Sequence, residues 1–219
     1  LIFISMERSA FFLTMLSIIF ILFFTKKYKL IRLLCFTASV IVIVTLTIKN
    51  EALKDRMFLH PIKALTQTIE KKHVLTDVHD SLYKTSFKMF EQNKILGIGP
   101  KMYRKHSRDE RYQVGSSSFN THPHNTYIQL LAETGLIGFA IFILFVITFL
   151  FKTFLHFKNL LLKKNHLSDF SVCIMAAIFI NIWPIIPTGN FFNNWMSIVY
   201  YLPLGFYFSS LCQQEKSIY

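Results

Sequence analysis

Two histidines, an asparagine and a glutamate stand where a long polar segment gives way to an apolar run. The stretch begins His122-Pro123-His124-Asn125 and reaches Glu133 among residues that are mainly hydrophobic. Imidazole exchanges a proton near neutral pH, which makes His122 and His124 candidates for acid–base chemistry. The same residues fit a plain helix start with Asn125 as its N-cap. The residues alone leave both interpretations open.

Glu133 is the second candidate for chemistry. If a helix starts near Thr126, Glu133 lies about 10 Å along it, at 1.5 Å per residue. At that depth it falls inside a membrane boundary, where an ionisable residue is a functional candidate. The alternative is a short interfacial helix that ends at Gly135 and leaves Glu133 in water.

Arginines and a further histidine outside the apolar runs form the third group. Arg8 precedes the first run, whereas Arg56, His79 and Arg104 lie in the long polar segment. Arginines beside imidazoles suit a phosphate or pyrophosphate held by charge-assisted hydrogen bonds. Arg8 could instead pair with Glu7 or extend towards water. The sequence has no CxxC or HExxH motif near these residues, so we expect no metal site.

Apolar runs are the elements that must position these side chains. The chain is 53% hydrophobic, above the roughly 45–50% that is usual for soluble domains. Its apolar residues gather in five runs, at about 9–25, 33–48, 127–151, 170–186 and 191–211. Each is close to or above the length of about 20 residues that a membrane span needs. We therefore predict an all-α polytopic membrane protein with about five transmembrane helices.

The positions of lysine and arginine predict the orientation. The two short basic loops, 26–32 and 152–164, fall on one side, and the positive-inside rule makes that side cytoplasmic. The predicted division is two transmembrane helices in 1–48, an external loop in 49–125, and three transmembrane helices with a short cytoplasmic tail in 126–219. The net charge of +12 then follows from topology, so we expect no nucleic-acid binding.

The external segment 49–125 should have structure of its own, because bare connectors of that length are uncommon. Its apolar residues between 80 and 92 fit an amphipathic helix. A tight turn is predicted next, at Gly97-Ile98-Gly99-Pro100. Without a strand–helix unit around it, Gly-x-Gly is a weak nucleotide signal, and we interpret it as backbone shaping.

These motifs together resemble a known family. The string from His122 to Gly138, the turn at 93–100 and the segment from Ser5 to Ala10 are similar to the C-terminal domain shared by bacterial O-antigen ligases and O-antigen polymerases. Because the chain starts inside an apolar run, we expect it to be an N-terminally truncated fragment. The resemblance implies a multi-pass glycosyltransferase of lipopolysaccharide biosynthesis in the bacterial inner (cytoplasmic) membrane, with the large loop periplasmic.

The resemblance also implies substrates and roles. The donor would be a glycan on undecaprenyl diphosphate, and the acceptor would be lipid A–core or a growing glycan. His124 matches the family's functional histidine, and Arg8 matches the arginine before the span. A further family arginine has no clear counterpart, because His79 occupies its place. Catalytic roles are thus expected for His124, Arg8 and Glu133. Substrate contacts are expected for Arg104, Arg56, His79, His122 and Asn125.

The expected reaction is an inverting transfer without a metal or a cofactor. The chain has no Asp-x-Asp motif, which disfavours a nucleotide-sugar donor held by a metal, and arginine can replace the charge of that metal. The alternative class is a membrane transporter or sensor fragment whose external loop binds a solute. That class predicts paired broken helices near the bilayer midplane.

Overall fold

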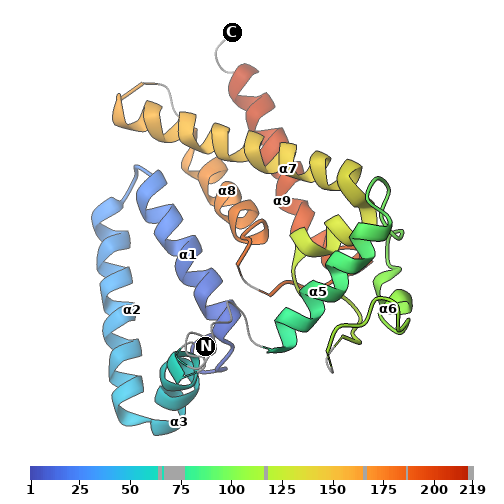
Figure 1. The fold of residues 1–219 in the computed structure, drawn as a ribbon. Helices are drawn as coiled ribbons and strands as arrows, with labels where there is room; N and C mark the ends of the chain where they lie inside the picture. Colours follow the sequence, from blue (N-terminus) through green and yellow to red (C-terminus); the bar gives the residue numbers. More distant parts are fainter. Residues whose placement is uncertain (64–65, 67–76, 116–117, 165–166, 186, 217–219) are drawn as a thin grey trace. The chain divides into compact units, whose positions relative to one another are not determined.

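The computed structural model describes residues 1–63, 66, 77–115, 118–164, 167–185 and 187–216. Throughout these residues the regular elements are helices, as predicted, and none is a strand (Figure 1). The contacts divide the chain into two compact units. Unit 1 comprises Leu1–Lys72, Thr153–Asn181 and Leu202–Tyr219. Unit 2 comprises His73–Lys152 and Ile182–Tyr201.

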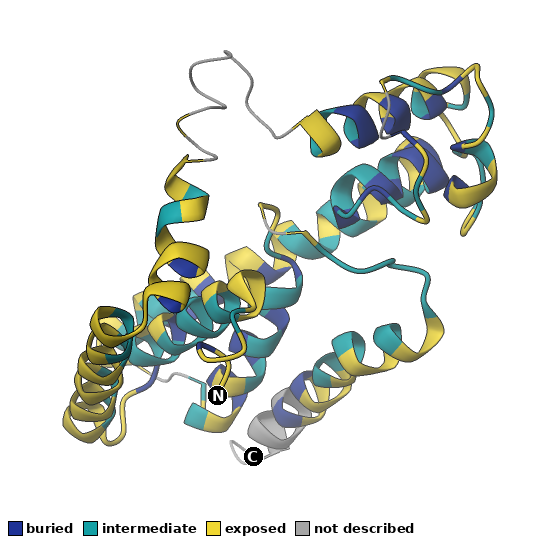
Figure 2. Cartoon of the chain, turned by 90° about the horizontal axis from the view of Figure 1, so that it is seen from below, coloured by how far each residue is buried: buried dark blue, intermediate teal, exposed yellow. Residues whose placement is uncertain are grey.

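Unit 1 is built around three apolar helices: α1 (Arg8–Phe24), α2 (Lys29–Lys49) and α8 (Asp169–Asn181). α1 packs along α8, where the rings of Phe20 and Phe179 lie 5.0 Å apart. α2 has no buried residue and is coloured mainly as exposed in Figure 2. An apolar helix with so little protein contact suits a lipid environment.

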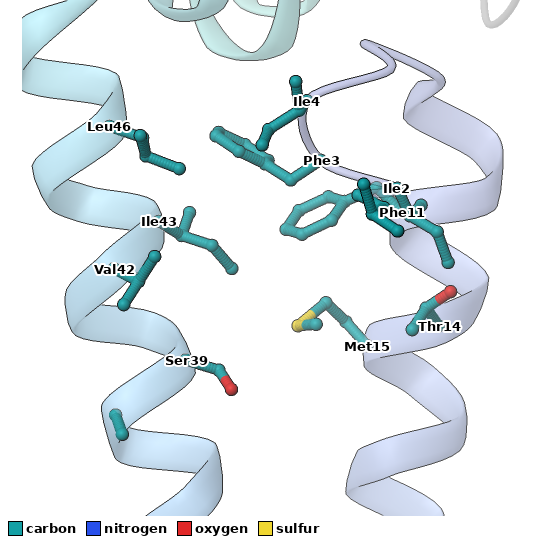
Figure 3. A pocket seen from close by; sticks show the side chains of 12 residues that line it. Ile2, Phe3, Ile4, Phe11, Thr14, Met15, Ser39, Val42, Ile43 and Leu46 are labelled. Atoms are coloured by element: carbon teal, nitrogen blue, oxygen red, sulfur yellow. The ribbon is translucent and has the colours of Figure 1, made fainter.

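After α2, unit 1 continues with two short helices, α3 (Glu51–Lys54) and η1 (Asp55–Leu59). Leu53 and Met57 from these helices bury the ring of Phe3. Side chains of α1 and α2 face each other across an apolar cavity of about 690 Å³ (Figure 3). Its lining is almost entirely hydrocarbon, so unit 1 offers space that favours an apolar occupant.

Unit 2 contains α5 (Asp77–Gln92), α6 (Tyr103–His106) and the first parts of α7 (Thr126–Leu161) and α9 (Asn194–Lys216). The amphipathic helix predicted for 80–92 is confirmed, with Leu82 and Met89 completely buried. Its buried face also holds hydroxyl side chains, including Thr85, whereas Phe87 is exposed. The core of the unit is formed by Met89, Tyr103, Tyr112 and Ala132.

Two helices in the described part of the chain, α2 and α7, are long and apolar enough to cross a membrane. α1 and α8 are apolar but shorter, with 17 and 13 residues. α8 ends at Asn181, before the end of the predicted run 170–186, because Pro184 cannot continue a helix. Five spans around an external loop therefore stay a prediction, and so does the division at residues 48 and 125.

Candidate functional site

Helix α7 is interrupted at Gly135, whose backbone has φ 62° and ψ −161°. The interruption removes the helical donors of the Ala132 and Glu133 carbonyls. The N–H groups of Ile98 and Gly99 take their place, at 3.0 and 2.9 Å. The predicted turn therefore crosses α7 at the point where the helical hydrogen bonds of α7 are interrupted.

Backbone N–H groups of α7 also donate hydrogen bonds to the segment that contains the turn. The N–H groups of Leu136 and Ile137 donate to the carbonyls of Lys94 and Ile95, at 2.8 and 3.3 Å. Segment 94–99 thus satisfies the backbone on both sides of the break. In an apolar environment these hydrogen bonds stabilise the break, because each unsatisfied backbone group costs several kcal/mol.

Two glycines make this close approach possible. A Cβ on Gly97 would lie 2.4 Å from the carbonyl carbon of Glu133, and a Cβ on Gly135 would lie 2.4 Å from the carbonyl oxygen of Ile95. Both glycines also have left-handed backbones, with φ of 69° and 62°, which L side chains disfavour. The glycines of the predicted turn therefore shape the backbone.

Glu133 lies in the last turn before the break, and its side chain is completely buried. Its Oε1 accepts from the N–H of Tyr103 at 2.7 Å, and its Oε2 accepts from the Gln129 amide at 2.9 Å. The Gln129 amide also donates to Asn190 Oδ1 at 2.8 Å and accepts from the N–H of Phe191 at 3.0 Å. The pair therefore ties α6, α7 and the segment before α9 together. The alternative with Glu133 in water is wrong.

His124 lies just before α7, in a left-handed backbone conformation with φ 57°. Its Nε2 is 3.1 Å from Nδ2 of Asn120. Its ring centroid is 4.2 Å from that of His122 and 6.4 Å from that of His79. Burial lowers the pKa of His124, and the two neighbouring imidazoles lower it further. Both effects favour the neutral ring, which is the form that a general base needs.

His122 is held from both sides of its ring. Its Nε2 is 3.1 Å from the carbonyl oxygen of Thr188, and its Nδ1 is 2.9 Å from Oγ1 of Thr121. Because a carbonyl only accepts, Nε2 carries the proton and the hydroxyl donates to Nδ1. Burial lowers the pKa of His122, and the bond to Thr188 opposes this. Thr188 also donates its N–H to the carbonyl of His124 at 2.9 Å.

Asn125 is the N-cap of α7, one of the two interpretations that the sequence left open. Its Oδ1 accepts from the N–H groups of Tyr127 and Ile128, at 3.0 and 3.1 Å. Its Nδ2 donates to the carbonyl of Pro184 at 2.8 Å. The cap at Asn125 is present together with the neighbouring rings of His79, His122 and His124, so the helix start does not exclude chemistry at His124.

His79 and Arg104, the two other predicted substrate contacts in unit 2, differ in exposure. His79 lies in the first turn of α5, and its buried Nδ1 has no hydrogen-bond partner in the described chain. Arg104 lies on α6 with an exposed side chain. Among the described residues, no group of three or more histidine, cysteine or acidic side chains could hold a metal ion.

Arg8 and Arg56 belong to unit 1. Nη1 of Arg8 is 3.3 Å from Nδ1 of His60, and Nε of Arg56 is 3.4 Å from the carbonyl oxygen of Met6. All three cationic or imidazole side chains are exposed. The start of α1 and the helix η1 therefore bring the predicted phosphate ligands Arg8 and Arg56 into one region of unit 1.

Comparison with known proteins decides the family. The sequence model of the O-antigen ligase family matches residues 1–143 of the chain. The chain belongs to the O-antigen ligase family. No curated protein and no solved structure matches the chain.

The region that matches the O-antigen ligase family includes Arg8, the turn at 97–99, His124 and Glu133. The segment that carries Thr188 and Asn190 lies beyond the match. That segment nevertheless supplies the hydrogen bonds that hold His122 and Gln129. The hydrogen bonds that hold His122 and Gln129 therefore extend past the matched region.

Three residues with clear roles in these contacts were missed from the sequence: Asn120, Gln129 and Thr188. The i, i+4 spacing of Gln129 and Glu133 on one helix was a usable signal, because such side chains meet on a helix face. Asn120 stands four residues before His124, in a segment without helical periodicity, and Thr188 stands 64 positions after it. Nothing in the sequence alone indicates those two contacts.

Proposed function

We propose that this chain transfers a glycan from a lipid diphosphate to a sugar hydroxyl, with His124 as the general base. The observation that carries the proposal is the state of His124. The ring is fixed beside two other imidazoles, and its pKa is lowered by burial and by both neighbours. A neutral, positioned imidazole accepts a hydroxyl proton effectively near neutral pH.

In the proposed reaction, the acceptor hydroxyl attacks the anomeric carbon as His124 takes its proton. The bond from that carbon to the diphosphate oxygen breaks, and the lipid diphosphate leaves with the electron pair. Attack from the face opposite the leaving group inverts the anomeric centre. The product is a glycan joined to lipid A–core in a ligase, or to the next glycan in a polymerase.

We assign stabilisation of the leaving diphosphate to Arg8, with Arg56 as a second cation. Both guanidinium groups are exposed, and guanidinium pairs with phosphate through charge-assisted hydrogen bonds. The apolar cavity of unit 1 begins at Leu1 to Ile4, just before Arg8, and offers space for hydrocarbon. Arg104, exposed on unit 2, is proposed to contact the glycan or phosphate of a substrate.

Glu133 receives a positioning role in this proposal. Both carboxylate oxygens accept hydrogen bonds from within unit 2, and the side chain has no exposed surface. It therefore orders the loop that leads to His124. His122 and Asn125 support the ring and the helix start, and His79 faces His124 from α5. We place the site on the periplasmic side of the inner membrane.

The test is a transfer assay with the protein in membranes, supplied with a lipid-diphosphate glycan, with and without EDTA. The variant is His124→Asn, because asparagine tolerates the left-handed backbone at this position. We expect wild-type transfer to survive EDTA and the variant to lose at least about 100-fold, the usual scale for general-base catalysis.

The control is His106→Ala, which removes a different imidazole of unit 2, one that lies edge-on against Tyr112. It should keep transfer. If His124→Asn transfers as well as wild type at equal expression, His124 is not the base. If wild type transfers to no acceptor, the transporter or sensor interpretation takes the place of this one.

A further inference from the structure

Within the described part of the chain, Asn120 makes the one hydrogen bond to the ring of His124. Its Nδ2 lies 3.1 Å from Nε2 of His124. The orientation of the amide follows from its other end, where Oδ1 accepts from the N–H of Thr121 at 2.7 Å. An N–H can only donate, so the atom beside it must be the amide oxygen. The NH₂ group therefore points at His124.

The backbone of Asn120 is itself anchored. Its carbonyl accepts from Oγ of Ser107 at 3.0 Å, and Ser107 is completely buried. Ser107 follows α6, which begins at Tyr103, the residue whose N–H donates to Glu133. The backbone of Asn120 is thus connected through Ser107 and α6 to the Glu133 carboxylate in α7, which explains how the amide keeps its place beside the ring.

The direction of this hydrogen bond determines the form of the ring. Because the Asn120 amide donates, Nε2 of His124 must be the acceptor, and the proton of the neutral ring lies on Nδ1. The lone pair on Nε2 is the one that can accept a proton. In the structure the NH₂ group of Asn120 covers that lone pair.

We propose that Asn120 is the positioning residue of His124, and that it marks where the acceptor hydroxyl binds. Its amide holds the neutral Nδ1–H tautomer and occupies the lone pair on Nε2 until a hydroxyl replaces it. The acceptor O–H then donates to Nε2 in the same direction. The second half of this inference rests on the proposed transfer reaction, whereas the tautomer does not.

The groups that face His124 fix the sign of the expected pH effect. They are His79 from α5 and His122 from its own loop, and both lower the pKa of His124. Thr188, from the segment before α9, contributes only an uncharged backbone contact. An amide that donates to Nε2 stabilises the neutral ring as well. Replacing it by a carboxylate must therefore favour the charged ring.

The test is Asn120→Asp, which keeps the size of the side chain and the acceptor for Thr121. Purified protein is treated with diethyl pyrocarbonate, which acylates neutral imidazole, from pH 5 to 8. Modification of His124 is followed by peptide mass spectrometry. We expect the midpoint of its titration to rise by roughly one pH unit or more in the variant. Asn120→Ala should increase the reactivity of His124 above the midpoint, because the lone pair is uncovered.

Asn193→Asp is the matched control, because it adds the same charge to unit 2 at a residue held by two backbone hydrogen bonds, from its N–H to Asn190 and from the N–H of Ser197 to its carbonyl. It should leave the titration of His124 in place. An unchanged midpoint in Asn120→Asp would overturn the assignment of Asn120. This labelling needs no substrate, so its result is independent of the proposed transfer.

A second arm measures transfer against pH. In Asn120→Asp the acid limb of the transfer rate should move to higher pH, in parallel with the labelling midpoint. A variant that only disturbed the fold would lower the rate without moving the limb. If labelling shifts but the limb does not, Asn120 sets the tautomer of His124 and does not mark the acceptor site.

Discussion

Glu133, for which the sequence predicts a catalytic role, lies at the centre of a buried hydrogen-bond network in unit 2. Its carboxylate and the Gln129 amide, both completely buried, join α6, α7 and the segment before α9. A buried charge is retained only when hydrogen bonds compensate for lost water. Here two donors come from within unit 2, which leaves neither oxygen without a partner.

Glu133→Gln tests this role. The new amide oxygen can still accept from Tyr103, but its NH₂ group then faces the NH₂ group of Gln129, so that two donors meet. We expect a loss of about 1–3 kcal/mol in the free energy of unfolding. Thermal unfolding of the purified protein in detergent measures it. Glu110→Gln, on the exposed surface, should change stability by less than about 0.5 kcal/mol. Equal stability of both variants would contradict the assignment.

At the scale of elements, the interruption of α7 is the feature that organises unit 2. Four backbone hydrogen bonds connect the turn 94–99 to the two sides of the break, two in each direction. A helix that continued through Gly135 would keep these groups for itself and release the turn. The turn is followed by α6, and α6 is followed by the buried Ser107. The Ser107 hydroxyl anchors the backbone carbonyl of Asn120.

Gly135→Ala should destabilise the protein by about 2–5 kcal/mol, from the left-handed backbone and from the contact with Ile95 together. Gly205→Ala is the matched control, because a Cβ there meets nothing within 4 Å. Gly205 lies inside α9, so alanine should be neutral or stabilising by up to about 1 kcal/mol. Thermal unfolding and yield in membranes report both. A harmless Gly135→Ala would mean that the break does not depend on glycine.

At the scale of the whole molecule, the basic loops predict which side of the membrane each segment faces. Lys105, beside Arg104, lies in the segment predicted to be external. Lys164 lies in the basic loop predicted to be cytoplasmic. Both side chains are exposed, so both positions are accessible to a labelling reagent.

We expect a membrane-impermeant maleimide on intact cells to label Lys105→Cys and to leave Lys164→Cys unlabelled. The native cysteines are first replaced, since Cys35 and Cys173 are exposed thiols. Permeabilised cells provide the control, in which both positions should react. Labelling of Lys164→Cys alone in intact cells would reverse the predicted orientation.

The sequence by itself determined the helical class, the amphipathic helix α5 and the family, and it offered the cap at Asn125 as one of two interpretations. Each of these depends on local periodicity or on a short string of residues, which a linear chain displays directly. It also predicted functional roles for His124 and Glu133, because polar groups at an apolar boundary are costly.

The tertiary structure alone decided how those groups are used. The bond from Asn120 to His124, the carbonyl of Thr188 behind His122 and the crossing of α7 by the turn at 97–99 join segments whose separation in the chain carries no pattern. The depth of Glu133 was likewise undecided, since a helix ending at Gly135 predicted an exposed carboxylate. The turn and α6 cover that end of the helix, and the Glu133 side chain, for which exposure to water was the alternative, is completely buried.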